Sequence, residues 1–128
     1  MDMADCPCGS GRDYADCCGS LHAGTAPVDA EALMRSRYVA YVLGLESYLL
    51  ATWHPDTRPR SLDLDTEPAT KWLGLEVKRH ALTGQDNAIV EFVARYKIAG
   101  RAHRLHEIGR FMRQAGRWVY LDGKDGSS

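Results

Sequence analysis

The stretch Cys6-Pro7-Cys8-Gly9-Ser10-Gly11-Arg12-Asp13-Tyr14-Ala15-Asp16-Cys17-Cys18 contains every cysteine of this 128-residue chain. Two thiols one residue apart are followed, after a gap of eight residues, by a vicinal pair. Four thiolates at this spacing can converge on one tetrahedral ion, and zinc is the usual occupant of closed sites built from protein sulfurs. The sequence therefore predicts one structural zinc ion held by Cys6, Cys8, Cys17 and Cys18.

The backbone between and after these cysteines bears on the fourth ligand. Gly9 and Gly11 allow the chain to curl so that backbone N–H groups face the sulfurs. Neighbouring side chains of a regular helix diverge by about 100°, so Cys17 and Cys18 need a distorted helix end to share one ion. His22, one helical turn after Cys18, is the alternative fourth ligand.

The sequence also bears on the cellular compartment, which decides whether the cysteines bind a metal ion or become oxidised. Residues 1–5 are acidic and lack the basic and apolar regions of a signal peptide. No apolar run approaches the roughly 20 residues that span a bilayer. We therefore expect a cytoplasmic protein without a membrane span. In that reducing compartment a metal site is favoured over the alternatives, a redox switch or a disulfide pair.

Downstream of the cysteines, helical patterns precede strand patterns. Apolar spacings of three to four predict a helix that begins near Thr25 and ends at Gly44, a second helix over 47–54, and a short third helix from 65 or 66 to 74. The period then changes to two, which predicts strands over 75–82, 88–98, 103–114 and 117–121. Helices followed by sequential strands indicate an α+β domain with an antiparallel meander.

Charge is distributed unevenly around a net charge of −1. Residues 95–117 carry seven bases against Glu107 alone, whereas residues 1–34 carry six acids against Arg12 alone. A basic half could attract an acidic partner or nucleic acid, but outward strand positions also favour charged side chains for solubility. Because the overall charge is low, we do not expect nucleic acid as a partner.

The cysteine segment resembles the SEC-C motif, the small zinc module at the C-terminus of the SecA translocase motor. The motif reads Cys-x-Cys-x-Ser-Gly, with eight residues between the second and third cysteines, and closes on Cys or His. The matching positions here are Cys6, Cys8, Ser10, Gly11, Cys17 and Cys18. Cys18 stands where the translocase has histidine. The resemblance implies a zinc knuckle that docks a protein partner.

The whole chain resembles the YchJ family of small, uncharacterised bacterial proteins. The resemblance rests on Cys-Pro-Cys-Gly-Ser-Gly, on Ala-Leu-Met-Arg-Ser-Arg-Tyr over 32–38, on Ala-Thr-Trp-His-Pro over 51–55 and on Val-Glu-Phe-Val-Ala-Arg-Tyr over 90–96. It implies a nuclear transport factor 2-like (cystatin-like) cone, in which helices pack on a curved antiparallel sheet of about four strands. We therefore expect a knuckle at 1–24, the cone at 25–123 and a disordered tail at 124–128.

A cone of this kind encloses a pocket between helices and sheet. The period of two places Glu107 on the same face as Leu105 and Phe111. A core-facing carboxylate has a raised pKa unless it is paired, and Glu107 could then act as a general base. The alternative is a structural ion pair with Arg35 or Arg37 of the first helix.

Other candidate pocket residues lie on the two helices. Tyr38 and Tyr41 are on the apolar side of the first helix, as core or pocket wall, and Arg37 and Trp53 are candidates beside them. His54 could line the pocket as an acid or proton shuttle. It could equally bond the last carbonyls of the second helix.

Two hypotheses on function follow. The leading one is a zinc-binding adaptor whose knuckle docks a protein partner. The alternative is a small-molecule-binding enzyme of isomerase, dehydratase or hydrolase type that uses Glu107 as general base. The sequence presents no set of nucleophile, base and orienting group, so the enzyme is the less favoured of the two. Partner, substrate and oligomeric state do not follow from the sequence.

Overall fold

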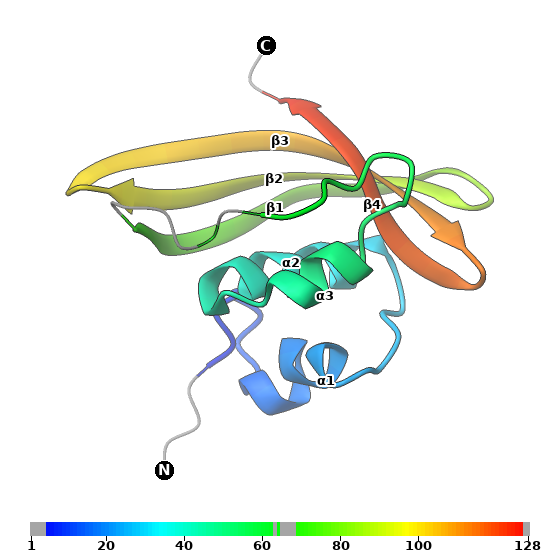
Figure 1. Ribbon diagram of the computed structural model, residues 1–128, viewed down its shortest axis with the longest axis horizontal. Helices are drawn as coiled ribbons and strands as arrows, with labels where there is room; N and C mark the ends of the chain where they lie inside the picture. The colour runs from blue at the N-terminus through cyan, green and yellow to red at the C-terminus, as the bar shows by residue number, and fades with distance from the viewer. Residues whose placement is uncertain (1–4, 63, 65–68, 127–128) are drawn as a thin grey trace.

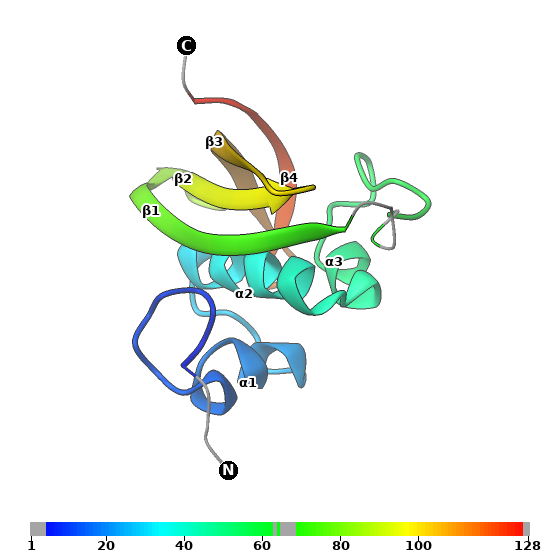
Figure 2. The same cartoon turned by 90° about the vertical axis from the view of Figure 1, so that its left-hand side faces the viewer.

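A four-stranded antiparallel sheet curves over two helices, with a small N-terminal segment on the far side of the helices (Figures 1 and 2). The computed structural model describes residues 5–62, 64 and 69–126. In chain order the elements are the 3-10 turn η1 (Tyr14–Asp16), α1 (Cys18–His22), α2 (Ala30–Leu43), α3 (Glu46–Ala51), β1 (Thr70–Gly84), β2 (Asn87–Ile98), β3 (Arg101–Gln114) and β4 (Arg117–Asp125). The strands pair in sequence order, so the predicted meander is confirmed.

Tight turns and bulges give the sheet its shape. The β2–β3 and β3–β4 hairpins both turn on an Ala-Gly pair with positive φ at each residue, 53° and 78° at Ala99-Gly100 and 53° and 79° at Ala115-Gly116. Such turns match the right-handed twist of the flanking strands. Register shifts interrupt β1 at three places and the β3–β4 ladder at one. Bulges of this kind bend strands, so the sheet curls over α2 instead of lying flat.

Helix α2 starts later than expected. Its N-cap is Asp29, whose carboxylate accepts a hydrogen bond of 2.8 Å from the N–H of Ala32, and not Thr25. An aspartate satisfies an orphan N–H and complements the positive helix end better than the threonine four residues earlier. The helix ends at Gly44 as predicted, with φ 74° in the left-handed region.

The expected third helix is wrong from Thr70 onward, where β1 begins, and its start at 65–68 lies outside the described residues. Trp72 pairs with Tyr96 of β2 and sets its ring edge-on to Tyr38 at a centroid distance of 5.7 Å. Extended backbone lets this large ring reach the helix below it. Burial of the indole therefore outweighs the local pattern that favoured a helix.

The second helix ends at Ala51, earlier than expected, because the residues after it pair with β4. The N–H of Tyr120 donates to the Thr52 carbonyl, and the N–H of His54 donates to the Tyr120 carbonyl, both at 2.8 Å. These bonds form a short parallel bridge between Trp53 and Tyr120. The segment that follows α3 is thereby hydrogen-bonded to β4, the last strand.

The expected disordered tail is also wrong over most of its length. Strand β4 continues to Asp125, and the Gly126 N–H donates to the His106 carbonyl at 2.9 Å. These ladder bonds satisfy backbone groups that would otherwise be left to solvent. Residues 127–128 lie outside the described part. Among the helices that are described, none has the length and hydropathy to cross a membrane.

Candidate metal centre and ligand cavity

The four cysteines meet at one point. Their sulfur atoms all lie within 4.8 Å of one another, and the Cys8 and Cys17 sulfurs are 3.7 Å apart. Zinc–sulfur bonds of about 2.3 Å at tetrahedral angles place sulfurs about 3.8 Å apart. The arrangement therefore fits an ion at its centre, and the four clustered cysteines form a metal site.

Short-range backbone bonds and two glycines shape the knuckle around this site. The Cys6 N–H donates to the Arg12 carbonyl at 2.8 Å and closes the loop that carries the first two sulfurs. Gly9 and Gly11 have φ of 84° and 82°, a conformation that L side chains rarely adopt. The Ser10 hydroxyl lies 3.3 Å from the Cys17 sulfur, so it can orient that ligand.

The site is part of the protein core and not an appended module. Cys8 is fully buried, and Cys6 and Cys18 are nearly so, in the cluster that also contains Leu33 of α2. Arg35 of α2 donates from Nη1 to the Cys8 carbonyl at 2.7 Å. The knuckle is therefore bonded to α2, which is the same helix that lies beneath the sheet (Figure 2).

The vicinal cysteines adopt different backbone conformations. Cys17 has φ −121° and ψ −113° and lies between η1 and α1, whereas Cys18 begins α1. This break between two short helical segments is the distortion that the sequence requires. His22 stands outside the cluster, because its ring nitrogens lie 2.7 Å from the Tyr14 hydroxyl and 2.8 Å from the Ser36 carbonyl.

The thiols strongly influence one another. A hydrogen bond from the Cys18 thiol lowers the pKa of Cys8 to about 4. The same bond, with burial, raises the pKa of Cys18. Crowded thiolates repel when no cation is present, and a bound cation removes the need for this shared proton. The electrostatics of the cluster thus favour a divalent ion.

A second site lies between α2 and the sheet, where a cavity of about 290 Å³ opens. Its walls are mostly aromatic: Tyr38, Tyr41, Trp53, Trp72, Phe92 and Tyr120. Met34, Ala94 and Leu105 complete the apolar lining, and Arg37 and Glu107 are the charged groups. Apolar walls with a few polar groups are typical of small-molecule sites.

Arg37 reaches this cavity from α2 and is only 4% exposed. Its Nη1 donates to the Leu49 carbonyl at 2.8 Å and to the Thr52 hydroxyl at 2.7 Å. The guanidinium carbon lies 4.9 Å from the centre of the Trp53 ring and 4.7 Å from that of Tyr120. Burial lowers the pKa of Arg37 to about 10, so the group stays charged at neutral pH.

Glu107 enters the same cavity from β3, as the strand alternation predicts. Burial raises the pKa of its carboxyl, while hydrogen bonding by Tyr120 and the charge of Arg37 oppose that rise. Glu107 and Arg37 make no direct ion pair, although each is in the field of the other. Arg35, the other suggested partner, points to the knuckle and pairs with Glu31 at 3.0 Å.

The structure does not place His54 in the cavity. Its ring is buried beside β4, where Nδ1 accepts a hydrogen bond of 3.0 Å from the Asp56 N–H. Its carbonyl accepts from the N–H groups of Thr57 and Arg58. Because His54 is not among the residues that line this cavity, its position does not support the expected acid or proton shuttle there.

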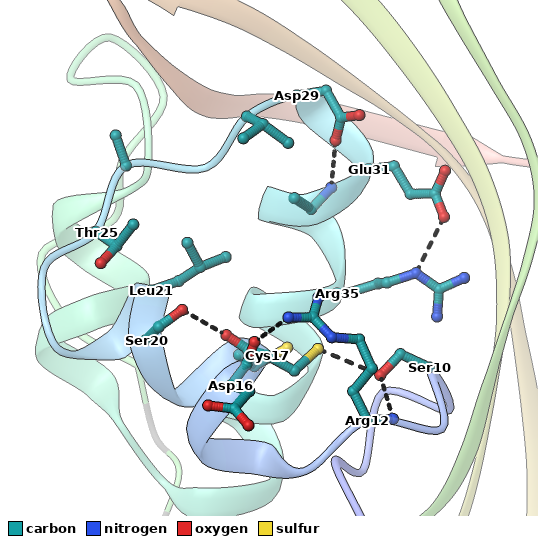
Figure 3. Close-up of a pocket in the computed structure, with 14 residues that line it drawn as sticks. Ser10, Arg12, Asp16, Cys17, Ser20, Leu21, Thr25, Asp29, Glu31 and Arg35 are labelled. Carbon is teal, nitrogen blue, oxygen red and sulfur yellow. Dashed lines mark hydrogen bonds and ion pairs between the residues drawn. The ribbon is translucent and has the colours of Figure 1, made fainter.

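A groove of about 450 Å³ runs beside the metal cluster, between the knuckle and the start of α2 (Figure 3). Arg12 donates to the Asp16 carbonyl at one end, and Arg35 pairs with Glu31 at the other side. Val28, at the rim, is 87% exposed. The groove thus combines the Arg35–Glu31 ion pair, an arginine that donates to a backbone carbonyl, and an apolar residue that is not covered.

Two family models match the chain. The SEC-C motif model matches residues 4–20, and the model for the middle NTF2-like domain of YchJ matches residues 29–123. A UPF0225 protein of Ralstonia nicotianae is 56% identical, over 94% of this chain and 90% of the relative. One of Xanthomonas oryzae is 56% identical over 97% of each. The chain belongs to the UPF0225, or YchJ-like, family.

Solved structures confirm the fold expected of a UPF0225 protein. The SEC-C motif protein of Rhodopseudomonas palustris superimposes with a TM-score of 0.83 at 35% identity, covering 95% of this chain and 98% of that one. The SEC-C motif protein of Psychrobacter arcticus gives 0.77 at 29% identity, covering 96% and 83%. The NTF2-like α+β cone preceded by a four-cysteine cluster is therefore established for this family member.

The cavity contains the candidates Arg37, Tyr38, Tyr41, Trp53 and Glu107 together. Two lining residues of this UPF0225 protein were not predicted from the sequence: Trp72, which falls in the expected third helix, and Tyr120. The alternation in β4 was a usable signal, because Trp118 is buried and Tyr120 points to the same face of the strand.

Proposed function

We propose that this UPF0225 protein binds a small molecule in the cone and uses one structural zinc ion to hold the knuckle against α2. The observation that carries the proposal is an aromatic cavity whose wall holds the buried guanidinium of Arg37 and the indole N–H of Trp53, which has no partner among the described residues. A small-molecule-binding role also accounts for the cavity without requiring a set of catalytic groups.

The donor set supports zinc in a structural role. Four sulfurs at tetrahedral spacing leave no open coordination position for water or substrate, and such closed sites stabilise folds. Mass spectrometry under native conditions should therefore find one zinc ion per chain. Protein purified without a metal ion but with an intact fold would contradict this role.

The polar groups of the cavity support ligand binding. Arg37 donates two hydrogen bonds from Nη1, to the Leu49 carbonyl and the Thr52 hydroxyl, and these hold its guanidinium at the cavity wall. The indole N–H of Trp53, from the same cavity wall, is buried without a partner among the described residues. Buried donors that lack acceptors are costly. A ligand with acceptor atoms would satisfy them.

A thermal-shift screen with a library of small polar aromatics tests this proposal. Ala94→Met should fill part of the cavity, because Ala94 is a buried wall residue. Ala102→Met is the matched control, since Ala102 is exposed on the neighbouring strand. Ligands that stabilise the wild type and the control but not Ala94→Met support the proposal. A screen without any such ligand refutes it.

Docking of a protein partner by the knuckle is the second candidate, and exposed Val28 beside the groove favours it. Val28→Asp should abolish capture of a partner without unfolding the protein. Leu82→Asp, at a position 67% exposed on β1, is the control. A partner that both variants retain would exclude the groove as the docking surface.

Catalysis in the cavity is a further use of the same groups. The raised pKa of Glu107 suits a general base, and this is the observation that favours an enzyme. A substrate found through the screen would test it, because Glu107→Gln should then abolish turnover while binding persists.

A further inference from the structure

Two opposite charges share the cavity without touching. Arg37 and Glu107 come from α2 and β3, and each shifts the pKa of the other without an ion-pair contact. Both residues line the cavity, so a group bound there can meet donors of Arg37 and acceptor oxygens of Glu107. This pair of charges therefore specifies the polar end of a ligand.

We propose that the cavity selects uncharged ligands whose polar group accepts from Arg37 and donates to Glu107, with a primary amide on a planar apolar body as the simplest case. This inference rests on the proposed small-molecule function. It also assigns Glu107 the role of setting charge selectivity.

Charge balance is the reason for a neutral ligand. The positive charge of the Arg37 guanidinium and the negative charge of the Glu107 carboxylate cancel. A carboxylate ligand would therefore bring an uncompensated negative charge into a buried site, and an ammonium ligand would bring an uncompensated positive charge. The other titratable groups that face the cavity are Tyr38, Tyr41 and Tyr120, and burial raises the pKa of each. All three remain neutral at pH 8 and do not alter the balance.

One carboxylate that does not line the cavity also influences Glu107. Asp122 of β4 raises the pKa of Glu107 through its own charge, but it is held by Arg110 in two hydrogen bonds of 2.6 Å. Its charge is therefore largely compensated outside the cavity. The selectivity depends on Arg37 and Glu107.

The walls specify the rest of the ligand. A volume of about 290 Å³ corresponds to roughly ten water molecules, which suits a single aromatic ring with a short polar arm. Trp53 and Tyr120 meet edge to face at 5.1 Å, and Trp72 lies 5.9 Å from Tyr41. A planar ring can pack against such faces with favourable aromatic geometry.

Three probes of matched shape separate the possibilities: phenylacetamide, phenylacetate and phenethylamine. Calorimetric titration at pH 8 keeps Arg37 charged, since its pKa is about 10. Wild type should bind the amide about tenfold to a hundredfold more tightly than either charged probe. Glu107→Gln should reverse the order in favour of phenylacetate, because the site then carries a net positive charge.

Glu91→Gln is the matched control, since Glu91 lies on the opposite face of the sheet, where it pairs with His106 at 2.7 Å. That variant should keep the preference of the wild type. Tighter binding of phenylacetate by wild type, or an unchanged order in Glu107→Gln, overturns the inference. If no probe binds but the broader screen yields a ligand that Ala94→Met excludes, the inference fails and the proposed function stands. No ligand at all refutes both.

Discussion

Replacement of Gly19 by alanine places a methyl group where the knuckle has no room for it. A Cβ at this position would lie 2.7 Å from the Tyr14 carbonyl oxygen and 2.8 Å from its ring. The carbonyl belongs to the backbone and cannot rotate away. The Tyr14 hydroxyl is bonded to His22, which in turn contacts the Ser36 carbonyl of α2. A shift of Tyr14 therefore disturbs the connection between the knuckle and α2.

Two opposing effects decide the sign of this change. Alanine is favoured over glycine inside a helix by about 1 kcal/mol. Overpacking costs about 1–3 kcal/mol, and loss of the Tyr14–His22 hydrogen bond costs about 1 kcal/mol. The net expectation is a loss of about 1–3 kcal/mol in the free energy of unfolding. For a domain of this size that corresponds to a decrease of about 4–12 °C in Tm.

The assay is reversible unfolding in urea with zinc in excess, followed by tryptophan fluorescence. Gly74→Ala is the matched control, because its Cβ would meet nothing within 4 Å. We expect that variant to stay within about 0.5 kcal/mol of the wild type. Equal or greater stability of Gly19→Ala would show that Tyr14 does not pack as described.

Three further predictions concern the metal, the core and the cavity. Chelation of zinc should destabilise the whole protein in one transition, by about 4 kcal/mol if free zinc had been a thousand times its dissociation constant; a separate early transition of the knuckle alone would contradict the shared core. Leu33→Ala should lower the free energy of unfolding by about 2–5 kcal/mol. It should also weaken the retention of zinc, measured by mass spectrometry, because Leu33 packs in the same core cluster as the cysteines. Unchanged zinc retention would show that the zinc site does not depend on the packing of Leu33. Burial raises the pKa of Glu107 above its ordinary 4.5, so the folded protein keeps a proton that the unfolded chain has released. Stability should therefore fall as pH rises from 4.5 through the raised pKa, and an equally steep fall in Glu107→Gln would assign it to another group.

Local patterns predicted most of the strands and one helix end. The alternation over 88–98 and 103–114 agrees closely with β2 and β3, because side chains of a strand alternate wherever one face is buried. Gly44 ended α2 as expected, since its positive φ suits glycine. The start of β1 was missed because burial of Trp72 depends on α2, which is distant in sequence.

Cysteine spacing alone determined the metal cluster, since all four ligands come from one short loop whose geometry is local. The sequence also determined that Glu107 faces inward, because it shares a strand face with Phe111. Tertiary structure alone decided that Arg37, Glu107, Trp53 and Tyr120 surround one cavity. These residues lie on four different segments, and their meeting depends on strand register, bulges and the bridge between Trp53 and Tyr120. It likewise decided that His54 is not part of the cavity lining, because backbone bonds to β4 hold that segment in place.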